Sequence, residues 1–399
     1  MSSYHLRCRV CEEVSEPEPL NACRRCDGPT DVGYDWEGLE RTLTRAEVER
    51  RPQTLWRYQE LLPAGAQVDV GAGWTRLVPC EPLSELLDLD LHLKLESENP
   101  TRSYKDRIAT IAVSAALDYG VTTLCCSSTG NLGDAVAAAA SATGLEAVVL
   151  VPAGSASAAA EVERPGVHVL AVRGTYDECR RLELELGALF PWGFVSGNLH
   201  PYAGEGAKTI SFEIAEQLGW QLPDAVVCPA ASGTLFAKLT QGFAELTRAG
   251  LAREPLPRMF AAQALGSSPI AAAFADDRGI SRVHAETQVA SLAVGNPVHG
   301  DLALGAARAT GGAVLAVSDD EISAYTELLS ETTGVSPDAS GGAALGALIA
   351  ARRNGLLEAG TRVVLVVTGR QPRTTVDGPH VQTIDPDAGD VLAALGLQS

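Results

Sequence analysis

Short apolar runs alternate with longer amphipathic segments along most of this chain of 399 residues. Six runs rich in valine, leucine and alanine have the length of buried strands, so we predict strands at residues 89–95, 121–127, 147–151, 225–229, 259–263 and 362–367. The segments between them have helical spacing, and helices are expected at residues 36–60, 132–142, 178–189, 209–218, 235–246, 319–332 and 341–353. This alternation predicts an α/β fold: parallel twisted sheets flanked by helices, with ligands at the carboxyl ends of the strands.

Composition narrows the class of protein further. Hydrophobic residues make up 46% of the chain but aromatic residues only 5%, which suits helices packed closely on parallel sheets. The net charge of −19 argues against nucleic acid or an anionic membrane surface as a partner. No apolar stretch is long enough to cross a bilayer, and the first residues contain no apolar signal core, so a cytoplasmic protein is expected.

Four of the nine cysteines form a pattern. Cys8 and Cys11 make one C-x2-C knuckle, and Cys23 and Cys26 make a second. Two such knuckles can place four thiolates around one tetrahedral ion, which predicts a structural zinc ribbon in residues 1–35. Free thiols or a redox pair are the alternatives, and the absence of a βαβ pattern around either knuckle disfavours the redox pair. The other five cysteines have apolar or helical neighbours and are expected in the core.

Lys105 follows the run Asn99-Pro100-Thr101 and precedes Asp106-Arg107. Pro100 ends the preceding strand and Thr101 can cap a first helical turn, so Lys105 is expected at the start of a helix. An amine held there, close to unpaired N–H groups, suits an imine with an aldehyde cofactor. A solvated surface turn is the alternative interpretation, and it would be preferred for a lysine considered alone.

Three more segments of small polar residues stand at predicted strand ends. The first ends in Asn131, whose amide could face a cleft at the start of the next helix. The second is a loop that could bind a phosphate at a helix N-terminus through bare N–H groups; its residues are Ala231, Ser232, Gly233 and Thr234. The third ends the last core strand with the hydroxyl of Thr368. Together they favour a cofactor site over a surface turn.

The lysine run resembles the signature of pyridoxal-phosphate enzymes of the tryptophan-synthase-β type (fold type II), in particular threonine synthase. The usual form is Asn-Pro-Thr-Gly-Ser-Phe-Lys-Asp-Arg, and here Arg102 replaces the glycine and Tyr104 the phenylalanine. The resemblance covers nearly the whole chain. It implies a two-lobed enzyme: residues 36–95 and 202–399 would form the larger lobe with the phosphate loop, and residues 96–201 the smaller lobe with the lysine.

The resemblance also implies roles for single residues. Lys105 would carry pyridoxal 5'-phosphate as an imine and act as the catalytic base. Asn131 would contact the phenolic oxygen of the cofactor, and Thr368 its ring nitrogen. Ala231, Ser232, Gly233 and Thr234 would bind its phosphate, whereas Ser128 and Thr129 would face the substrate. Arg181 and Lys208 would supply positive charge for a substrate phosphate.

The activity implied is that of a pyridoxal-phosphate-dependent lyase, namely conversion of O-phosphohomoserine and water to threonine and phosphate. Several substrate-side positions depart from the family pattern: His200, Ala203 and Ala207 replace Asn, Arg and Gln, Asp338 lies in the segment that replaces Glu-Pro-Ala-Ser, and Arg370 replaces a histidine. A related enzyme acting on another activated amino acid, such as β-replacement on O-phosphoserine, is therefore an alternative. A non-catalytic cofactor-binding paralogue is a third possibility, and a homodimer is compatible with the resemblance.

Overall fold

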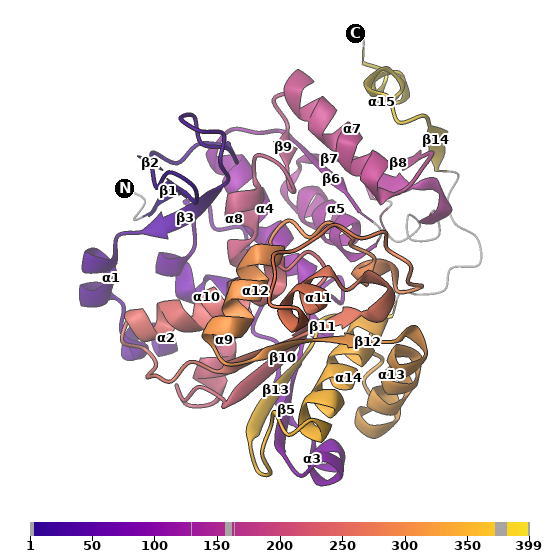
Figure 1. The fold of residues 1–399 in the computed structure, drawn as a ribbon. Helices are drawn as coiled ribbons and strands as arrows, with labels where there is room; N and C mark the ends of the chain where they lie inside the picture. The colour runs from indigo at the N-terminus through magenta and orange to yellow at the C-terminus, as the bar shows by residue number, and fades with distance from the viewer. Residues whose placement is uncertain (1–3, 129, 156–161, 163, 372–380, 398–399) are drawn as a thin grey trace.

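The computed structural model of the chain describes residues 4–128, 130–155, 162, 164–371 and 381–397. Two helix-covered sheets lie side by side, and a small ribbon of strands packs at one edge of the molecule near the N-terminus (Figure 1). Parallel sheets flanked by helices are the architecture predicted from the alternating pattern, and that prediction is confirmed.

The larger sheet has the strand order β12-β11-β10-β13-β5-β4. All neighbours are parallel except β4, which pairs antiparallel with β5 at the edge. The strands are β4 (Leu77–Pro79), β5 (Asp90–Leu95), β10 (Ala225–Pro229), β11 (Arg258–Ala264), β12 (Ala313–Val317) and β13 (Arg362–Val367). Leu95 pairs with Val367, and Leu365 pairs with Val227. The carboxyl ends of β5, β13 and β10 therefore reach the same edge of the sheet.

The smaller sheet has the order β14-β8-β7-β6-β9, and all of its pairings are parallel. Its strands are β6 (Thr123–Ser127), β7 (Glu146–Pro152), β8 (Val167–Val172), β9 (Gly193–Phe194) and β14 (Gln382–Ile384). We expected residues 202–399 to belong to the larger lobe, and this is wrong for the tail, because β14 pairs with β8. Three residues of β14 carry too little pattern to show this in the sequence.

Helices cover both sheets. They are α1 (Trp36–Thr42), α2 (Arg45–Arg50), α3 (Glu81–Leu87), α4 (Lys105–Asp118), α5 (Asn131–Thr143), α7 (Tyr176–Leu189), α8 (His200–Ala203), α9 (Glu205–Gln217), α10 (Thr234–Arg248), α11 (Pro269–Ala275), α12 (Gly300–Ala309), α13 (Asp319–Thr333), α14 (Ala339–Arg353) and α15 (Ala388–Leu395). Short 3-10 turns are η1 (Leu55–Leu61), η2 (Glu96–Glu98), η3 (Ala153–Ser155), η4 (Leu265–Ser267) and η5 (Ala290–Leu292). None of the helices in these described ranges is long and apolar enough to cross a membrane.

The region predicted as one helix, residues 36–60, is instead α1, α2 and η1. Thr44 breaks it first, because its hydroxyl accepts the Glu47 amide and so caps a new helix. Pro52 breaks it again, since proline cannot donate to a helical ladder. The charged residues and the aromatic face in the sequence favoured a single helix. The cap at Thr44 and the proline at position 52 divide the region instead.

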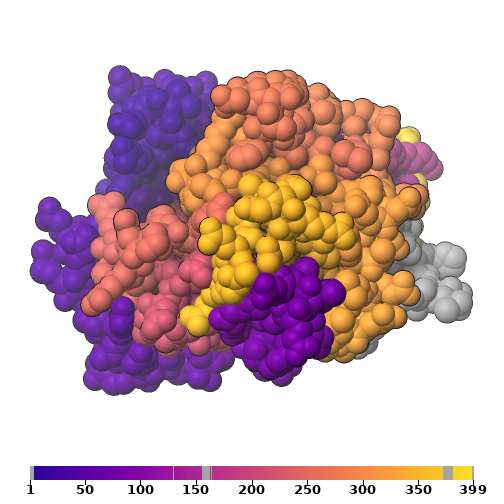
Figure 2. Space-filling model, turned by 60° about the horizontal axis from the view of Figure 1, so that its bottom comes forward, coloured from indigo at the N-terminus to yellow at the C-terminus, as the bar shows by residue number. Residues whose placement is uncertain are grey.

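Segments far apart in the sequence share the core of the larger lobe. β5 pairs with β13 along its length, and the apolar helix α14 packs on β10, β11, β12 and β13. Figure 2 shows the result on one face of the molecule, where the early segment containing α3 (purple) lies against the late segment (yellow and orange). The side chains between these layers are mainly buried alanine, valine and leucine, as the composition indicated.

Candidate active site

Lys105 is the first residue of α4 and is half-buried at the end of a tightly bonded turn. The Asp106 carboxylate accepts both the amide and the hydroxyl of Thr101, at 2.7 and 2.8 Å. The Tyr104 amide donates to the Thr368 carbonyl at 3.0 Å, and the Tyr104 ring lies 4.7 Å from Nζ of Lys105. Within the described residues, Nζ of Lys105 has no carboxylate at ion-pair distance. The backbone around Lys105 is therefore fixed, whereas its amine is not tied up in an ion pair and can react.

Arg102 occupies the turn where the usual motif has glycine. Its φ is 64°, in the left-handed region that glycine adopts without strain. Its carbonyl accepts the Arg370 amide at 3.0 Å, and neighbouring Ser103 forms an isolated antiparallel bridge with Gly369. The lysine turn and the segment after β13 are therefore joined by backbone contacts on both sides of Ser103.

The backbone at Gly369 passes close to two other segments, and a side chain there would be crowded. A Cβ at this position would lie 2.9 Å from Oδ2 of Asp338 and 3.3 Å from Nδ2 of Asn131. Thr368, the residue before Gly369, is buried, and its hydroxyl donates to Oδ1 of Asp338 at 3.4 Å. The structure thus brings the segments of Lys105, Asn131 and Thr368 together, as we predicted from the strand ends.

The predicted phosphate loop follows β10 at the same edge of the sheet. Gly233 is the N-cap of α10, and its φ of 82° is again left-handed. A Cβ there would lie 2.5 Å from the carbonyl oxygen of His299, so only glycine fits without a shift. No side chain caps α10, and the hydroxyls of Ser232 and Thr234 lie 3.1 Å apart beside its first turn. This arrangement can accept a phosphate at the helix N-terminus.

His299 supports this loop from behind, and the sequence offered no clear signal for it. Its amide donates to the Ser232 carbonyl at 2.9 Å, and its Nδ1 lies 3.1 Å from Oγ1 of Thr234. Nε2 lies 3.4 Å from the guanidinium of Arg9 in the N-terminal ribbon. Burial lowers the pKa of His299 to about 3, so the ring is neutral at ordinary pH. The sequence Asn296-Pro297 just before it was the nearest signal.

The residues predicted to face the substrate have different places in the structure. Ser128 is buried, and its hydroxyl accepts the amides of Gly130 and Gly133 at 3.0 and 2.9 Å, so it stabilises the first turn of α5. Thr129 lies outside the described residues. A substrate contact of Ser128 stays a prediction. The observed role of its hydroxyl is to accept amides at the start of α5.

Lys208 was expected at the mouth of the cleft, and this prediction is wrong. Its side chain is fully buried, and its ammonium group pairs with Glu205 and with Glu245 at 2.7 Å. It also donates to the hydroxyl of Tyr34 at 3.0 Å. A lysine can face the interior when buried carboxylates pair with it, and the linear sequence does not show which carboxylates will be its neighbours.

Arg181 is likewise engaged away from the lysine turn. It is exposed on α7, where it pairs with Glu185 one helical turn later at 3.1 Å and donates to the Pro386 carbonyl. No described contact links it to Lys105, Asn131 or Thr368. The prediction that Arg181 binds a substrate phosphate has no support from the described contacts.

The ribbon brings its four predicted cysteines together. It consists of β1 (Tyr4–Cys8), β2 (Val14–Ser15) and β3 (Thr30–Tyr34) in the order β2-β1-β3. The sulfur atoms of Cys8, Cys11, Cys23 and Cys26 all lie within 4.8 Å of one another. Hydrogen bonds from the Cys11 and Val10 amides lower the pKa of Cys8 to about 6, which favours a thiolate there. Four sulfur ligands at this separation suit a closed tetrahedral site.

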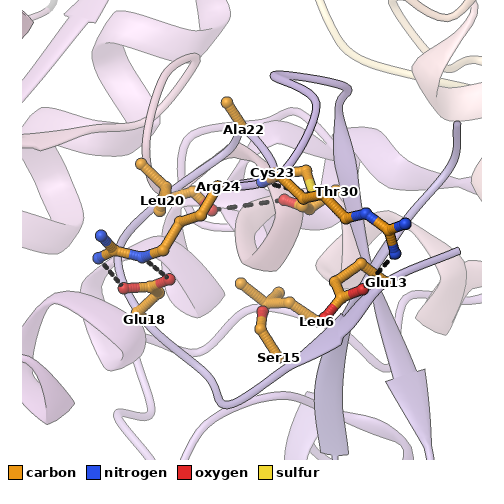
Figure 3. A pocket seen from close by; sticks show the side chains of 10 residues that line it. Leu6, Glu13, Ser15, Glu18, Leu20, Ala22, Cys23, Arg24 and Thr30 are labelled. Carbon is orange, nitrogen blue, oxygen red and sulfur yellow. Dashed lines mark hydrogen bonds and ion pairs between the residues drawn. The ribbon is translucent and has the colours of Figure 1, made fainter. Parts of the chain in front are cut away.

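A cavity of about 270 Å³ lies within the same ribbon (Figure 3). Its charged side chains are already paired: Arg24 donates to Glu18 at 2.9 Å, and Arg25 donates to Glu13 at 3.1 Å. Thr30 donates to the Leu20 carbonyl across one side. Because the charged groups around this cavity are paired within the ribbon, the active-site candidate remains the strand-end cluster.

Sequence comparison relates this chain to known proteins. The sequence model of the family described as pyridoxal-phosphate dependent enzyme matches residues 68–369. The chain is 33% identical over 384 residues to threonine synthase of Methanosarcina acetivorans, which covers 94% of each chain. It is 32% identical over 372 residues to threonine synthase of Methanocaldococcus jannaschii, covering 91% of each chain.

Solved structures show a related fold. Maize serine racemase matches with a TM-score of 0.66 and 21% identity, over 77% of this chain and 92% of that one. Threonine deaminase isoform 2 from Solanum lycopersicum matches with a TM-score of 0.65 and 18% identity, over 91% of this chain and 89% of that one. At these identities the likeness concerns the fold alone.

Proposed function

Because this chain belongs to the family of pyridoxal-phosphate-dependent enzymes, we propose that it is a threonine synthase, converting O-phosphohomoserine and water to threonine and phosphate. The observation that carries the proposal is the 33% identity with a threonine synthase over 94% of both chains. The predicted family and the class of pyridoxal-phosphate-dependent lyase are confirmed by the same comparisons. The substrate and the role of each residue are the proposal.

The strand-end cluster fits pyridoxal 5'-phosphate. Lys105 would hold the aldehyde carbon, Asn131 the phenolic oxygen and Thr368 the ring nitrogen. The residues for the phosphate would be Ala231, Ser232, Gly233 and Thr234, at the uncapped start of α10. The close approach of Asn131 and Asp338 to Gly369 supports this assignment, because it brings the strand-end segments of the proposed cofactor site together.

When bound, the cofactor supplies an electron sink for negative charge at the α-carbon of an amino acid. The rest of the chemistry falls to the chain. The Lys105 amine, fixed at the head of α4, would take the proton from the α-carbon and move protons at the β-carbon. The leaving phosphate needs donors, and water must then reach the β-carbon.

The source of positive charge for that phosphate differs from our first expectation. Lys208 is buried in an ion network and Arg181 lies on an outer helix face. The arginines that adjoin the lysine turn are Arg102 and Arg370, joined by a backbone hydrogen bond of 3.0 Å. Arg102 precedes Lys105 by three residues and Arg370 follows Thr368 by two, and we propose that they supply this charge. Ala203 stands where the family pattern has an arginine, so Arg370 would compensate for that loss.

The test combines a spectrum with a product assay. Purified protein loaded with cofactor is mixed with O-phosphohomoserine, O-phosphoserine or O-acetylserine, and absorbance, threonine and phosphate are measured. Threonine and phosphate in equal amounts from O-phosphohomoserine support the proposal. The Lys105→Ala variant should lose the lysine imine absorbance and at least about 10²-fold in rate, because the base is gone. Background phosphate release with O-phosphohomoserine would sink it.

A second candidate is β-replacement on O-phosphoserine or another activated amino acid. The missing arginine at Ala203 and the buried Lys208 weigh against a phosphorylated substrate and so favour the uncharged member of this class, an ester such as O-acetylserine. Consumption of O-phosphoserine or O-acetylserine with an added nucleophile, while O-phosphohomoserine stays unchanged, would identify this activity. The same screen therefore separates the two.

We also propose that Cys8, Cys11, Cys23 and Cys26 bind one structural zinc ion. Their mutual sulfur distances support a four-thiolate site, and no water position is needed to complete it. Metal analysis of freshly purified protein should find close to one zinc per chain. Less than about half an equivalent would contradict the proposal, because closed thiolate sites bind tightly.

A further inference from the structure

His299 is buried and contacts the predicted phosphate loop at three points. Its amide donates to the Ser232 carbonyl at 2.9 Å, and its Nδ1 lies 3.1 Å from the hydroxyl oxygen of Thr234. Its carbonyl oxygen lies so close to Gly233 that a Cβ there would be 2.5 Å away. Ala231, in the same loop, has no polar side chain with which to hold itself. His299 therefore supports the N–H groups that would meet a phosphate.

The N-terminal ribbon reaches His299 through the other ring nitrogen. Arg9 follows Cys8 in the first cysteine knuckle, and a nitrogen of its guanidinium lies 3.4 Å from Nε2 of His299. The same guanidinium lies 3.3 Å from the Asp31 carboxylate of β3, and the Arg9 amide donates to the Pro29 carbonyl at 2.9 Å. Both the backbone and the head group of Arg9 are thus held by the ribbon.

Other bonds hold the ribbon against the helices around the loop. The Tyr202 hydroxyl of α8 donates to the Glu18 carbonyl at 2.6 Å and accepts the Glu18 amide at 3.0 Å. The Tyr34 hydroxyl of β3 donates to Glu205 at 2.9 Å, and Glu205 pairs with Lys238 of α10. These bonds keep the ribbon in place independently of its contact with the loop.

The direction of the hydrogen bonds follows from the donors. Burial, together with nearby lysine and arginine, lowers the pKa of His299 to about 3, so the ring is neutral. A guanidinium has no acceptor, so Nε2 accepts from Arg9, and the single ring proton is on Nδ1. Nδ1 then donates to the hydroxyl oxygen of Thr234. The hydroxyl proton of Thr234 is left for Ser232 or for a phosphate oxygen.

We propose that Arg9 and His299 are positioning residues through which the N-terminal ribbon fixes the phosphate loop, so that the ribbon strengthens binding of the cofactor phosphate. The inference rests on the proposed cofactor site and extends it to residues 1–35, which the proposed reaction does not otherwise use. Loss of the contact between the two residues should weaken binding of the phosphate group. The imine with Lys105 should still form, because neither residue has an assigned contact with the reacting atoms.

The test separates the phosphate from the rest of the cofactor. Pyridoxal 5'-phosphate and pyridoxal, which lacks the phosphate, are titrated into cofactor-free protein, and the imine absorbance gives a dissociation constant for each. The constant for pyridoxal divided by that for pyridoxal 5'-phosphate measures the contribution of the phosphate. In Arg9→Met this ratio should fall about tenfold, the effect of one lost hydrogen bond from a charged donor. The constant for pyridoxal itself should not change.

Arg7→Met is the matched control. Arg7 flanks the same knuckle, but it is exposed and pairs with Glu12 at 3.3 Å, so the ratio should equal that of the wild type. His299→Asn is the second variant, because asparagine keeps a donor near the position of Nδ1 and has no group at the position of Nε2. Its ratio should fall as in Arg9→Met. Combining the two substitutions should lower the ratio no further, because both break the same contact.

An unchanged ratio in Arg9→Met overturns the inference. An equal loss of affinity for both compounds also overturns it, since the ribbon would then act on the whole fold, and so do additive effects in the double variant. These outcomes leave the proposed reaction intact, because turnover is measured separately. Failure of the proposed function has a different signature: no turnover of any amino acid, or no imine at Lys105 in the wild type, which would remove this inference as well.

Discussion

Two buried ion networks lie along α9, and each contains two cations and two carboxylates. In the first, Arg107 and Lys94 pair with Glu96 and Glu213; in the second, Lys208 and Lys238 pair with Glu205 and Glu245. The first ties the start of α4, and therefore Lys105, to β5 and α9. The second ties α9 to α10, and through Tyr34 to the ribbon, since Tyr34 donates to Glu205 at 2.9 Å.

The networks differ in how their charges are satisfied. Arg107 contacts Glu96 through two nitrogens, at 2.7 and 2.8 Å, and also reaches Glu213 and the Thr209 hydroxyl. Burial would raise the pKa of Glu213, but Arg107 and Lys94 lower it to about 2. In the second network, burial raises the pKa of Glu245. With all four cations in place, Glu245 therefore takes up a proton more readily than Glu213.

The comparison predicts the largest effect at Arg107. Arg107→Met leaves Glu96 and Glu213 buried with only Lys94 between them, and removal of one partner of a buried pair costs about 3–5 kcal/mol. The free energy of unfolding in urea should fall by that amount. Cofactor occupancy, read from the imine absorbance, should fall with it, because the first turn of α4 loses its anchor. A variant with full stability would show that the network contributes little.

Lys208→Met should cost less, about 3 kcal/mol at most, because Glu245 can be protonated and Lys238 still pairs with Glu205. Imine absorbance should persist, since Lys105 is not anchored there. If Lys208 bound substrate after all, the Michaelis constant would rise sharply in protein of unchanged stability. Comparing urea unfolding with steady-state kinetics distinguishes these outcomes.

Acid should lower the free energy of unfolding, and His200 on α8 should contribute to this loss. Burial lowers the pKa of His200 to about 3, so the unfolded chain binds its proton first as the pH falls below the ordinary histidine value of about 6.5. The stability contributed by the neutral ring is thus present at neutral pH and lost progressively toward pH 3. In His200→Asn the loss of unfolding free energy between pH 7 and 4.5 should shrink by about 2 kcal/mol.

Buried carboxylates also make the free energy of unfolding depend on pH, but over a more acidic range. Glu205 and Glu213 have pKa values lowered to about 2 by their cations, so their contribution disappears only below the ordinary glutamate value. The His200 effect should therefore appear at higher pH than theirs. An unfolding free energy with the same pH dependence in wild type and His200→Asn would contradict the assignment.

The smallest effect is expected outside both networks. Arg181→Ala removes an exposed pair with Glu185, and such surface changes alter stability by less than about 0.5 kcal/mol. The Michaelis constant for O-phosphohomoserine should also stay the same. A several-fold rise in that constant would restore Arg181 as a phosphate ligand and would mean that α7 reaches the substrate in the bound state.

Much of the cofactor side could be predicted from the sequence, because each part sits at the end of a strand with strong pattern. The strands ending before the phosphate loop and before Thr368 have the predicted bounds, and Asn131 begins a helix as expected. The cysteine knuckles converge as their spacing indicated. Apart from the tail, the division into lobes at residues 96 and 202 stays a prediction. The homodimer and the cytoplasmic location also stay predictions.

Shorter or weaker elements were missed, among them β8, β9, β12, α11 and α12. β9 has two residues, and β8 includes His168, which interrupts its apolar run. Such segments become strands because a neighbouring strand offers hydrogen bonds and a buried face, and neither is visible in a single sequence.

The sequence by itself determined the alternation of strands and helices, the cysteine pairs and the place of Lys105 at the start of a helix. These depend on residues close together in the chain, through periodicity, caps and turns. Only the tertiary structure decided which charges face inward and which hydroxyl meets which carboxylate. Lys208 appeared to be a ligand for substrate until Glu205 and Glu245 were seen around it. Asp338 appeared to be a departure from a motif until Thr368 was found beside it, since burial and pairing arise between distant segments.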